Sequence, residues 1–247
     1  MRAPWIPIAA AVVAGTPACD GHARSSPAPT APARDEHTER RETMVTDQIE
    51  ARGVADARVL AALRAVPRHE FVPERFRDLA YEDHPLPIGL EQTISQPYIV
   101  ALMTEAAKVG PESRVLEVGT GSGYQAAVLA RICREVYSIE ILPELADTAR
   151  ARLERLGFAN VRVRAGDGYL GWPEAAPFDA VLVTAGAPDV PQPLVDQLRP
   201  GGRLVIPVGP ADAVQRLLVL AKRDDGGVER LDLGAVRFVP LVRERKP

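Results

Sequence analysis

The chain has 247 residues, 46% of them hydrophobic, which is enough to bury the core of one domain. Its 30 basic and 33 acidic residues give a formal net charge of -3, and this balance argues against a protein that binds nucleic acid through a basic field. Two cysteines and four scattered histidines offer neither a disulfide framework nor the spacing of a metal site, so we expect no metal.

The first 41 residues differ in composition from the rest of the chain. An apolar run followed by small residues within residues 1–19 resembles a secretory signal, and the run is too short to span a bilayer. Its end at Cys19 loosely resembles a lipoprotein processing site, which leaves export or lipid anchoring open. Residues 20–41 are rich in Ser, Pro, Ala and charge, a composition that predicts a disordered tether. We therefore expect a leader and tether at residues 1–41 and a single folded domain at residues 42–247.

The first part of this domain, residues 42–110, combines helices with a proline-rich segment. Apolar residues recur at roughly helical spacing from Met44 to Leu63 and Gly53 interrupts them, which predicts a pair of amphipathic helices. The prolines from Pro67 to Pro87 predict mostly loop with short turns. A helix is expected from Pro97 to Lys108, because proline favours the first position of a helix.

From residue 111 to residue 247, short β-rich runs alternate with helical stretches, the pattern of βαβ units and a parallel sheet. The expected strands are Arg114 to Val118, Glu135 to Ile139, Val161 to Ala165, Phe178 to Thr184 and Arg203 to Val208. The expected helices are Gly123 to Cys133 and Pro143 to Gly157, and the expected hairpin joins Arg216 to Lys222 with Val228 to Leu233. The predicted fold class is α/β, a doubly wound Rossmann-like and mostly parallel sheet with helices on both faces and an antiparallel edge hairpin.

A glycine-rich turn follows the first expected strand and precedes a helix. Gly119, Gly121 and Gly123 remove side chains where a ligand approaches the backbone, and the helix presents free N–H groups. These glycines alternate, whereas a dinucleotide-binding turn reads G-x-G-x-x-G. Glu117, two residues before the first glycine, would repel a pyrophosphate and attract a cation such as a sulfonium or an ammonium group.

Two further acids follow the next two expected strands. Glu140 lies about 20 residues further on, where an acid accepts the hydroxyl groups of a ribose. Asp167, followed by Gly168, is placed to accept a hydrogen bond from an adenine amino group. Together with Glu117, these residues predict a site for S-adenosyl-L-methionine, with S-adenosyl-L-homocysteine as the product.

Two motifs carry a resemblance to a large class of enzymes. Glu117-Val-Gly-Thr-Gly-Ser-Gly123 resembles the first motif of class I methyltransferases, and Pro200-Gly-Gly-Arg-Leu-Val205 resembles the motif of their fifth strand. The resemblance implies that the glycine turn and the first acid hold the methionine part of the cofactor, the second acid holds the ribose and the third lies by the adenine. Those roles fall on Glu117, Gly119, Gly121, Glu140 and Asp167.

A polar segment bounded by prolines lies upstream, in Pro85-Leu-Pro-Ile-Gly89 and Gln92-Thr-Ile-Ser-Gln-Pro97. It is similar to the signature of the protein-L-isoaspartate O-methyltransferase family, as are Arg68-His-Glu-Phe-Val-Pro73, Ala165-Gly-Asp-Gly168 and Val236-Arg-Phe-Val-Pro-Leu241. The resemblance covers roughly residues 42 to 242, with a departure at Leu90-Glu91. It implies methylation of the free α-carboxylate of isoaspartyl residues, which begins the repair of damaged proteins.

The resemblance marks Ser95 as the active-site residue. A carboxylate with a pKa of about 3.9 is already ionised at neutral pH, so that the reaction needs alignment rather than a strong base. The Ser95 hydroxyl is expected to donate to one carboxylate oxygen and to orient the other, although a role as mere cap of the following helix is an alternative. We expect hydrogen bonds from two extended segments to clasp the substrate backbone. The residues expected to bind substrate are Thr93, Ile94, Gln96, Val239 and Pro240.

Three other interpretations remain open at this point. A methyltransferase of the same class could act on a hydroxyl or carboxyl group of a small molecule. An exported, non-catalytic nucleoside-binding protein would explain the signal-like leader. A nicotinamide dehydrogenase is disfavoured by the glycine spacing and by Glu117. The family resemblance implies a cytoplasmic protein that binds isoaspartyl proteins and peptides. We also expect a monomer whose folded domain makes no membrane contact.

Overall fold

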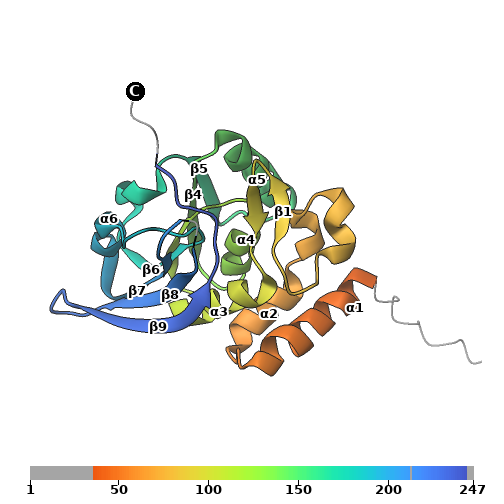
Figure 1. Ribbon diagram of the computed structural model, residues 1–247, viewed down its shortest axis with the longest axis horizontal. Helices are drawn as coiled ribbons and strands as arrows, with labels where there is room; N and C mark the ends of the chain where they lie inside the picture. The colour runs from red at the N-terminus through yellow and green to blue at the C-terminus, as the bar shows by residue number, and fades with distance from the viewer. Residues whose placement is uncertain (1–35, 212, 244–247) are drawn as a thin grey trace, which may run out of the picture. The chain divides into compact units, whose positions relative to one another are not determined.

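The structure of the protein is a computed structural model, which describes residues 36–211 and 213–243 (Figure 1). The signal-like leader at residues 1–19, with Cys19, and residues 20–35 of the expected tether lie outside the described residues. Among the residues that are described, no helix combines the length and the hydropathy that a bilayer span requires.

Within the described residues, seven strands form one sheet in the order β5-β4-β3-β6-β7-β8-β9. Neighbours from β5 to β7 pair in parallel, whereas β8 lies antiparallel to β7 and β9 antiparallel to β8. The strands are β3 (Arg114–Val118), β4 (Glu135–Glu140), β5 (Val161–Ala165), β6 (Phe178–Val183), β7 (Leu198–Val208), β8 (Gln215–Lys222) and β9 (Val228–Val236). This arrangement confirms the predicted fold class, including the antiparallel hairpin at the edge (Figure 1).

The expected bounds of the parallel strands agree with the structure to within one residue, except for β7. This strand begins at Leu198, which already pairs with Phe178, and the register then shifts before Arg203 pairs with Ala180. The sequence does not indicate this early start, because the proline and glycines of the intervening Pro200 to Gly202 segment are typical of turns.

Both faces of the sheet carry a hydrophobic core, because side chains alternate along each buried strand. Val115 and Leu182 pack in the core with the larger helices, whereas Leu116 and Val183 belong to the core on the other face. The helices of the first core are α2 (Ala57–Ala65), α3 (Pro97–Ala107), α4 (Tyr124–Ala130) and α5 (Pro143–Arg155). The second core is covered by the short α6 (Gln192–Asp196) and the 3-10 turn η6 (Pro173–Ala175).

The folded part of the chain begins earlier than the expected boundary at residue 42. Helix α1 (Glu36–Thr43) includes the last six residues of the expected tether and continues into η1 (Met44–Ile49) and η2 (Glu50–Arg52). No residue of α1 is buried, so the hydrophobic pattern could not reveal it. Polar contacts hold it instead: the His37 ring stacks on His69 with centroids 3.9 Å apart, and Arg41 donates to the carbonyl oxygen of Arg64.

The proline-rich segment forms two 3-10 turns, η3 (Arg68–Phe71) and η4 (Glu74–Leu79), as the expected short turns require. It then forms a small antiparallel pair that the prediction missed, β1 (Leu86–Gly89) and β2 (Gln92–Ile94). Leu90 and Glu91 make the connecting turn with φ of 50° and 58°. Two left-handed residues suit a two-residue hairpin loop, but glycine or asparagine normally signals such a turn and neither is present here. The departure from the family pattern at Leu90-Glu91 therefore lies in this turn.

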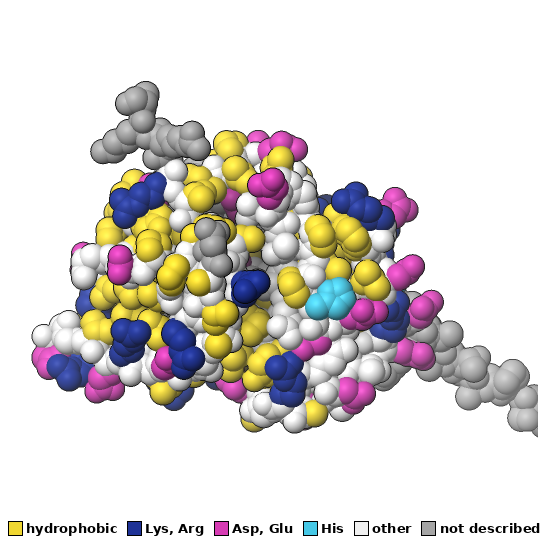
Figure 2. Space-filling model, in the orientation of Figure 1, with side chains coloured by type: hydrophobic (Ala, Val, Ile, Leu, Met, Phe, Trp, Pro, Cys, Tyr) yellow, Lys and Arg dark blue, Asp and Glu magenta, His cyan; other side chains and the backbone are white. Residues whose placement is uncertain are grey.

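The charged side chains show no segregation by sign on the face that Figure 2 presents. Lys and Arg side chains alternate there with Asp and Glu, and hydrophobic side chains lie between them. This distribution agrees with the nearly balanced composition of the chain. On this face, the field around the described residues is therefore not dominated by one sign of charge.

Candidate active site

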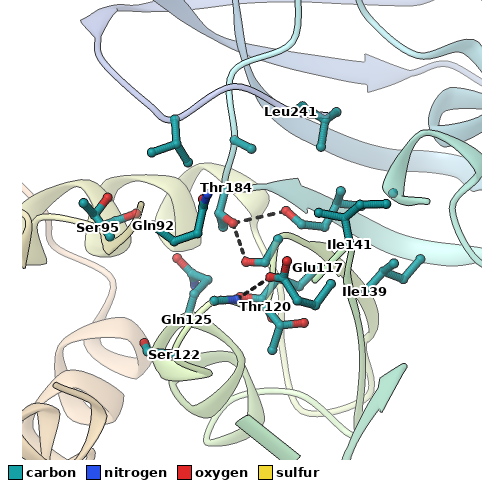
Figure 3. Close-up of a pocket in the computed structure, with 18 of the residues that line it drawn as sticks. Gln92, Ser95, Glu117, Thr120, Ser122, Gln125, Ile139, Ile141, Thr184 and Leu241 are labelled. Atoms are coloured by element: carbon teal, nitrogen blue, oxygen red, sulfur yellow. Dashed lines mark hydrogen bonds between the residues drawn. The ribbon is translucent and has the colours of Figure 1, made fainter. Parts of the chain in front are cut away.

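A cavity opens at the carboxyl ends of the parallel strands, where the order of the sheet reverses. After β3 the chain adds β4 and β5 on one side, and it later adds β6 and β7 on the other. Ligands of open α/β sheets bind at such a reversal. The strand ends contribute Glu117 to Ser122, Glu140 to Leu142, Gly168, and Thr184 with Ala185, while Gln92 to Ser95 and Val239 to Val242 close the cavity from outside the sheet (Figure 3).

The turn after β3 requires glycine for steric reasons. Gly119 has a φ of 98°, and a Cβ atom there would lie 2.5 Å from Thr184 Oγ1. The Thr184 hydroxyl lies 2.6 Å from the carbonyl oxygen of Gly119 and 3.1 Å from that of Val118, as the dashed lines in Figure 3 show. Thr184 thereby ties the end of β6 to the glycine turn. The turn leaves bare backbone facing the cavity.

Glu140 is fixed at the end of β4 by two backbone groups. Its Oε2 accepts a 2.8 Å hydrogen bond from the Gly121 amide, and its Oε1 accepts a 3.1 Å bond from the Leu142 amide. The side chain is held in one orientation and only 5% of the residue is exposed. Each carboxylate oxygen can accept a second hydrogen bond, so that the group is suited to a pair of ribose hydroxyls.

Glu117 lies fully buried one strand away. The Ser138 hydroxyl donates to its Oε2, and Ser138 Oγ lies 2.6 Å from Thr120 Oγ1. Burial raises the pKa of Glu117 from 4.5 to about 8, because a charged carboxylate loses its hydration there. A cation in the cavity would favour the ionised form, so the residue is suited to hold an ammonium or sulfonium group.

A buried arginine, Arg68, holds the loop that carries Ser95. Arg68 Nη2 donates to the carbonyl oxygen of Ser95 at 2.8 Å, and Arg68 Nε donates to that of Ala80 at 2.8 Å. Burial lowers the pKa of Arg68 to about 10, and its guanidinium lies 4.8 Å from the centre of the Tyr124 ring. The backbone of Ser95 is therefore positioned by contacts that leave its hydroxyl free to face the cavity.

Helix α3 is capped by Asp83 rather than by Ser95. The N-cap residue is Gln96, whose side chain makes no capping bond. Asp83 Oδ1 instead accepts from the Tyr98 amide at 3.0 Å, and Asp83 Oδ2 accepts from Gln96 Nε2 at 2.6 Å. The alternative that Ser95 serves as the cap of this helix is therefore wrong.

The segment after β9 crosses the cavity and is held by backbone pairing. The Gly186 amide donates to Val239 O at 2.8 Å, and the Leu241 amide donates to Gly186 O at 2.7 Å. At the preceding residue, the Phe238 amide donates to Oε1 of the buried Gln215 at 2.9 Å. These bonds fix Val239 and Leu241 in the wall of the cavity.

The structure brings most of the predicted residues to the cavity and sets three of them apart. Thr93, Ile94, Ser95, Glu117, Gly119, Gly121, Glu140, Gly168, Val239 and Pro240 line it. Gly123 instead allows α4 to approach α5, because a Cβ atom there would lie 3.2 Å from Leu153. Asp167 accepts from the Tyr169 amide and caps the turn η5 (Gly168–Leu170), and Gln96 faces a second cavity.

Other residues of the lining were not singled out from the sequence. Thr184 ends an expected strand, a position that could have been flagged on the same grounds as Glu117 and Glu140. Gln125 lies inside a helix, where nothing in the sequence distinguishes a buried glutamine from an exposed one. Within residues 36–211 and 213–243, no three His, Cys, Asp or Glu side chains gather as metal ligands. Cys133 is buried.

The fold and the cavity define a class I methyltransferase whose cofactor is S-adenosyl-L-methionine: bare backbone follows β3, Glu117 lies one residue before the end of β3, and Glu140 ends β4. The model of the family described as Protein-L-isoaspartate(D-aspartate) O-methyltransferase matches residues 39–246. The chain belongs to this family.

Relatives and solved structures agree with this assignment. The protein-L-isoaspartate O-methyltransferase of Opitutus terrae is 61% identical over 208 residues, which cover 84% of this chain and 89% of that protein. The enzyme of the same name from Gloeobacter violaceus is 58% identical, over 82% of this chain and 98% of that protein.

Two solved structures have the same fold. One, described as a protein-L-isoaspartate O-methyltransferase, is 33% identical with a TM-score of 0.73 over 81% of this chain, which spans 65% of that longer chain. Another, from Plasmodium falciparum and in complex with S-adenosyl-L-homocysteine, is 26% identical with a TM-score of 0.71, over 83% of this chain and 99% of that chain.

Proposed function

We propose that the protein transfers the methyl group of S-adenosyl-L-methionine to the free α-carboxylate of isoaspartyl residues in proteins and peptides, the first step of their repair. One observation carries the proposal. Ser95, Thr93, Thr184 and Val239 line the cofactor cavity and also a second cavity beside it. A methyl donor in the first cavity and an acceptor in the second would meet at Ser95.

The second cavity has the character of a peptide site. Its volume is about 420 Å³, and its lining is mainly apolar, from Pro85, Ile99, Val214 and Phe238. Arg237 is the charged residue among the described lining, and its guanidinium favours an anionic ligand. An isoaspartyl residue presents such an anion, because its α-carboxylate projects from a backbone that continues through the side chain.

The reaction requires the protein to position the acceptor carboxylate against the methyl group. When bound, S-adenosyl-L-methionine supplies a methyl group on a sulfonium, which a carboxylate oxygen attacks as the carbon–sulfur bond breaks. Ser95 would donate its hydroxyl hydrogen to one substrate oxygen and leave the other directed at the methyl group. Gln92 to Ser95, which include β2, and the segment from Val239 to Val242 line the cavity on the side away from the sheet, where they would limit the access of water to a bound cofactor. Alignment of this kind is worth several powers of ten in rate.

Fewer backbone groups are available to hydrogen-bond a substrate than the sequence analysis expected. Val239 O and the Leu241 amide pair with Gly186, so these two groups are engaged within the protein. We therefore assign substrate contacts in this segment to the side chains of Val239 and Pro240, and on the opposite side to Thr93, Ile94 and Gln96. These five residues remain our proposed substrate-binding set, with Ser95 between them.

We also propose a cytoplasmic monomer, because the cofactor is a cytoplasmic metabolite and the fold places both cavities within one chain. An exported or lipid-anchored form is the alternative if the leader at residues 1–19 is functional. Mass measurement of the mature N-terminus separates these two cases, since export by this leader would remove residues up to about Cys19.

The test of the proposed function uses two peptides that differ in one linkage. Methyl transfer from labelled cofactor is measured on a peptide with an isoaspartyl residue and on its aspartyl counterpart. We expect strong preference for the isoaspartyl form, because only that form carries a free α-carboxylate at the site. Equal methylation of both peptides, or methylation of small acids and of neither peptide, would contradict the proposal.

A further inference from the structure

Gln125 is a buried amide whose orientation the structure fixes. It lies in the first turn of α4, 6% exposed, and its Nε2 lies 2.9 Å from Thr104 Oγ1. Thr104 Oγ1 donates its only hydrogen to the carbonyl oxygen of Val100 at 2.7 Å. The threonine oxygen can therefore only accept from Gln125, which requires the amide nitrogen on this side. The amide oxygen Oε1 must point the other way.

This oxygen faces the cofactor cavity without a partner. Gln125 is among the residues that line the cavity, and Figure 3 shows its side chain below Gln92 and Ser95. Among the described residues, no donor makes a hydrogen bond with Gln125 Oε1, although the atom is shielded from solvent. A buried acceptor without a donor is costly, and in a binding cavity it indicates that a ligand supplies the donor.

The surroundings of Gln125 Oε1 specify which donor fits. Glu117, in the same cavity, has an Oε1 atom that no hydrogen bond of normal geometry reaches in the described part of the chain. The described lining contains no Lys, Arg or His. Because these two oxygens line one cavity, a single group with several N–H donors suits them both, whereas Glu140 is oriented for hydroxyl groups.

We propose that Gln125 Oε1 accepts a hydrogen bond from the α-ammonium group of the cofactor, beside Glu117, and that Thr104 is the positioning residue that keeps the amide in this orientation. The inference rests on the proposed function only through its cofactor. It makes no use of the peptide substrate, so that the two can fail separately.

The experiment compares two ligands by calorimetry on the full chain. S-adenosyl-L-homocysteine carries the ammonium group, and its deamino analogue keeps the carboxylate but lacks that group. Gln125→Leu should weaken binding of S-adenosyl-L-homocysteine about 10- to 100-fold, as expected for a hydrogen bond to a charged group, and leave the deamino analogue within about twofold. Gln48→Leu is the matched control, because Gln48 also has a buried, unpartnered Oε1 but lies outside both cavities.

A second pair of variants tests the positioning role and covers the case in which Gln125→Leu does not fold. Thr104→Val removes the acceptor that holds the amide, and Thr104→Ser keeps it. We expect Thr104→Val to weaken binding of S-adenosyl-L-homocysteine but not of its deamino analogue, and Thr104→Ser to restore wild-type affinity.

Two results would overturn the inference. Equal loss for both ligands would reduce Gln125 to a packing role. Unchanged affinity for both ligands with a raised KM for an isoaspartyl peptide would assign the amide to the peptide instead. If the wild-type chain binds S-adenosyl-L-homocysteine but methylates no peptide, the proposed function fails while this inference stands.

Discussion

Arg68 and Ser95 are joined by a hydrogen bond of 2.8 Å from Arg68 Nη2 to the carbonyl oxygen of Ser95, across 27 residues of sequence. The same guanidinium holds the carbonyl oxygen of Ala80, so one buried side chain fixes two loops. The Arg68 to Pro73 motif thus acquires a physical role. It sets the backbone on which the Ser95 hydroxyl is presented to the shared wall of the two cavities.

Replacing Arg68 should therefore affect turnover through Ser95. We expect Arg68→Met to lower kcat for an isoaspartyl peptide about 10- to 100-fold and the free energy of unfolding by roughly 2–4 kcal/mol, because two charge-assisted hydrogen bonds are lost. The Kd of S-adenosyl-L-homocysteine should stay within about twofold. Arg68→Lys, which keeps a charged donor, should fall between. Kinetics, calorimetry and denaturant unfolding supply the measurements, and an unchanged kcat in Arg68→Met would rule out the positioning role.

Glu117 should make cofactor binding depend on pH. Burial raises its pKa to about 8, so the carboxyl is mostly protonated in the free protein at neutral pH. A bound ammonium group favours the ionised form, and binding therefore releases a proton. We expect affinity for S-adenosyl-L-homocysteine to rise between about pH 6 and pH 8, by at most about tenfold per pH unit. Calorimetry in buffers of different ionisation enthalpy measures the released proton.

The same shift has the opposite effect on the stability of the free protein. Between the ordinary pKa of 4.5 and about 8, the folded state holds a proton that the unfolded state has lost. The free energy of unfolding should therefore fall as pH rises through this window. Glu117→Gln should remove both pH dependences. Proton uptake on ligand binding, or a variant with the same pH profile as the wild type, would show that Glu117 is not the group responsible.

Gly119→Ala should prevent the turn after β3 from packing against Thr184. Its new Cβ atom would lie 2.5 Å from Thr184 Oγ1, and its φ of 98° is unfavourable for alanine. Gly157→Ala is the control, because Gly157 has a φ of 80° but nothing within 4 Å of a Cβ atom. Both variants should lose roughly 1–2 kcal/mol of stability to the backbone conformation. Thermal shift with S-adenosyl-L-homocysteine should then be lost in Gly119→Ala alone, and similar shifts in both variants would contradict the steric account.

Asp83 links helix α3 to the loop of Ser95. We expect Asp83→Ala to lower the free energy of unfolding by about 1 kcal/mol and also to lower kcat, because it frees the Tyr98 amide and the Gln96 side chain. Asp56→Ala removes a comparable cap, at the start of α2, and should lower stability alone. The test measures denaturant unfolding and kcat for both variants. Equal kcat values for Asp83→Ala and Asp56→Ala would argue against a link between Asp83 and the loop of Ser95.

The parallel sheet could be predicted because its strands are buried apolar runs separated by helices, a pattern that survives in the sequence. Two of the features that escaped prediction lack this signal. Helix α1 buries no residue, and the β1–β2 pair turns at Leu90-Glu91, which are not turn-forming residue types. Contacts that join distant segments, such as that of His37 with His69, can be seen only in the folded chain.

The site shows the same division. Glu117 and Glu140 could be predicted, because the carboxyl ends of parallel strands border the ligand cavity of such a sheet. Asp167 follows the same rule in the sequence, yet its carboxylate caps the turn at Tyr169. Gln125 became visible only when its amide was seen between Thr104 and the cavity, since that arrangement depends on the packing of α3 against α4.

Ser95 is the residue on which the account depends most directly. The decisive measurement is the rate of methyl transfer by Ser95→Ala to an isoaspartyl peptide, together with the Kd of S-adenosyl-L-homocysteine for the same variant. We predict that kcat falls about 10- to 100-fold, because the carboxylate loses a hydrogen bond that orients it, while Kd changes by no more than about twofold. Undiminished turnover, or a loss of turnover matched by an equal loss of cofactor affinity, would contradict the proposal that acceptor and methyl donor meet at this hydroxyl.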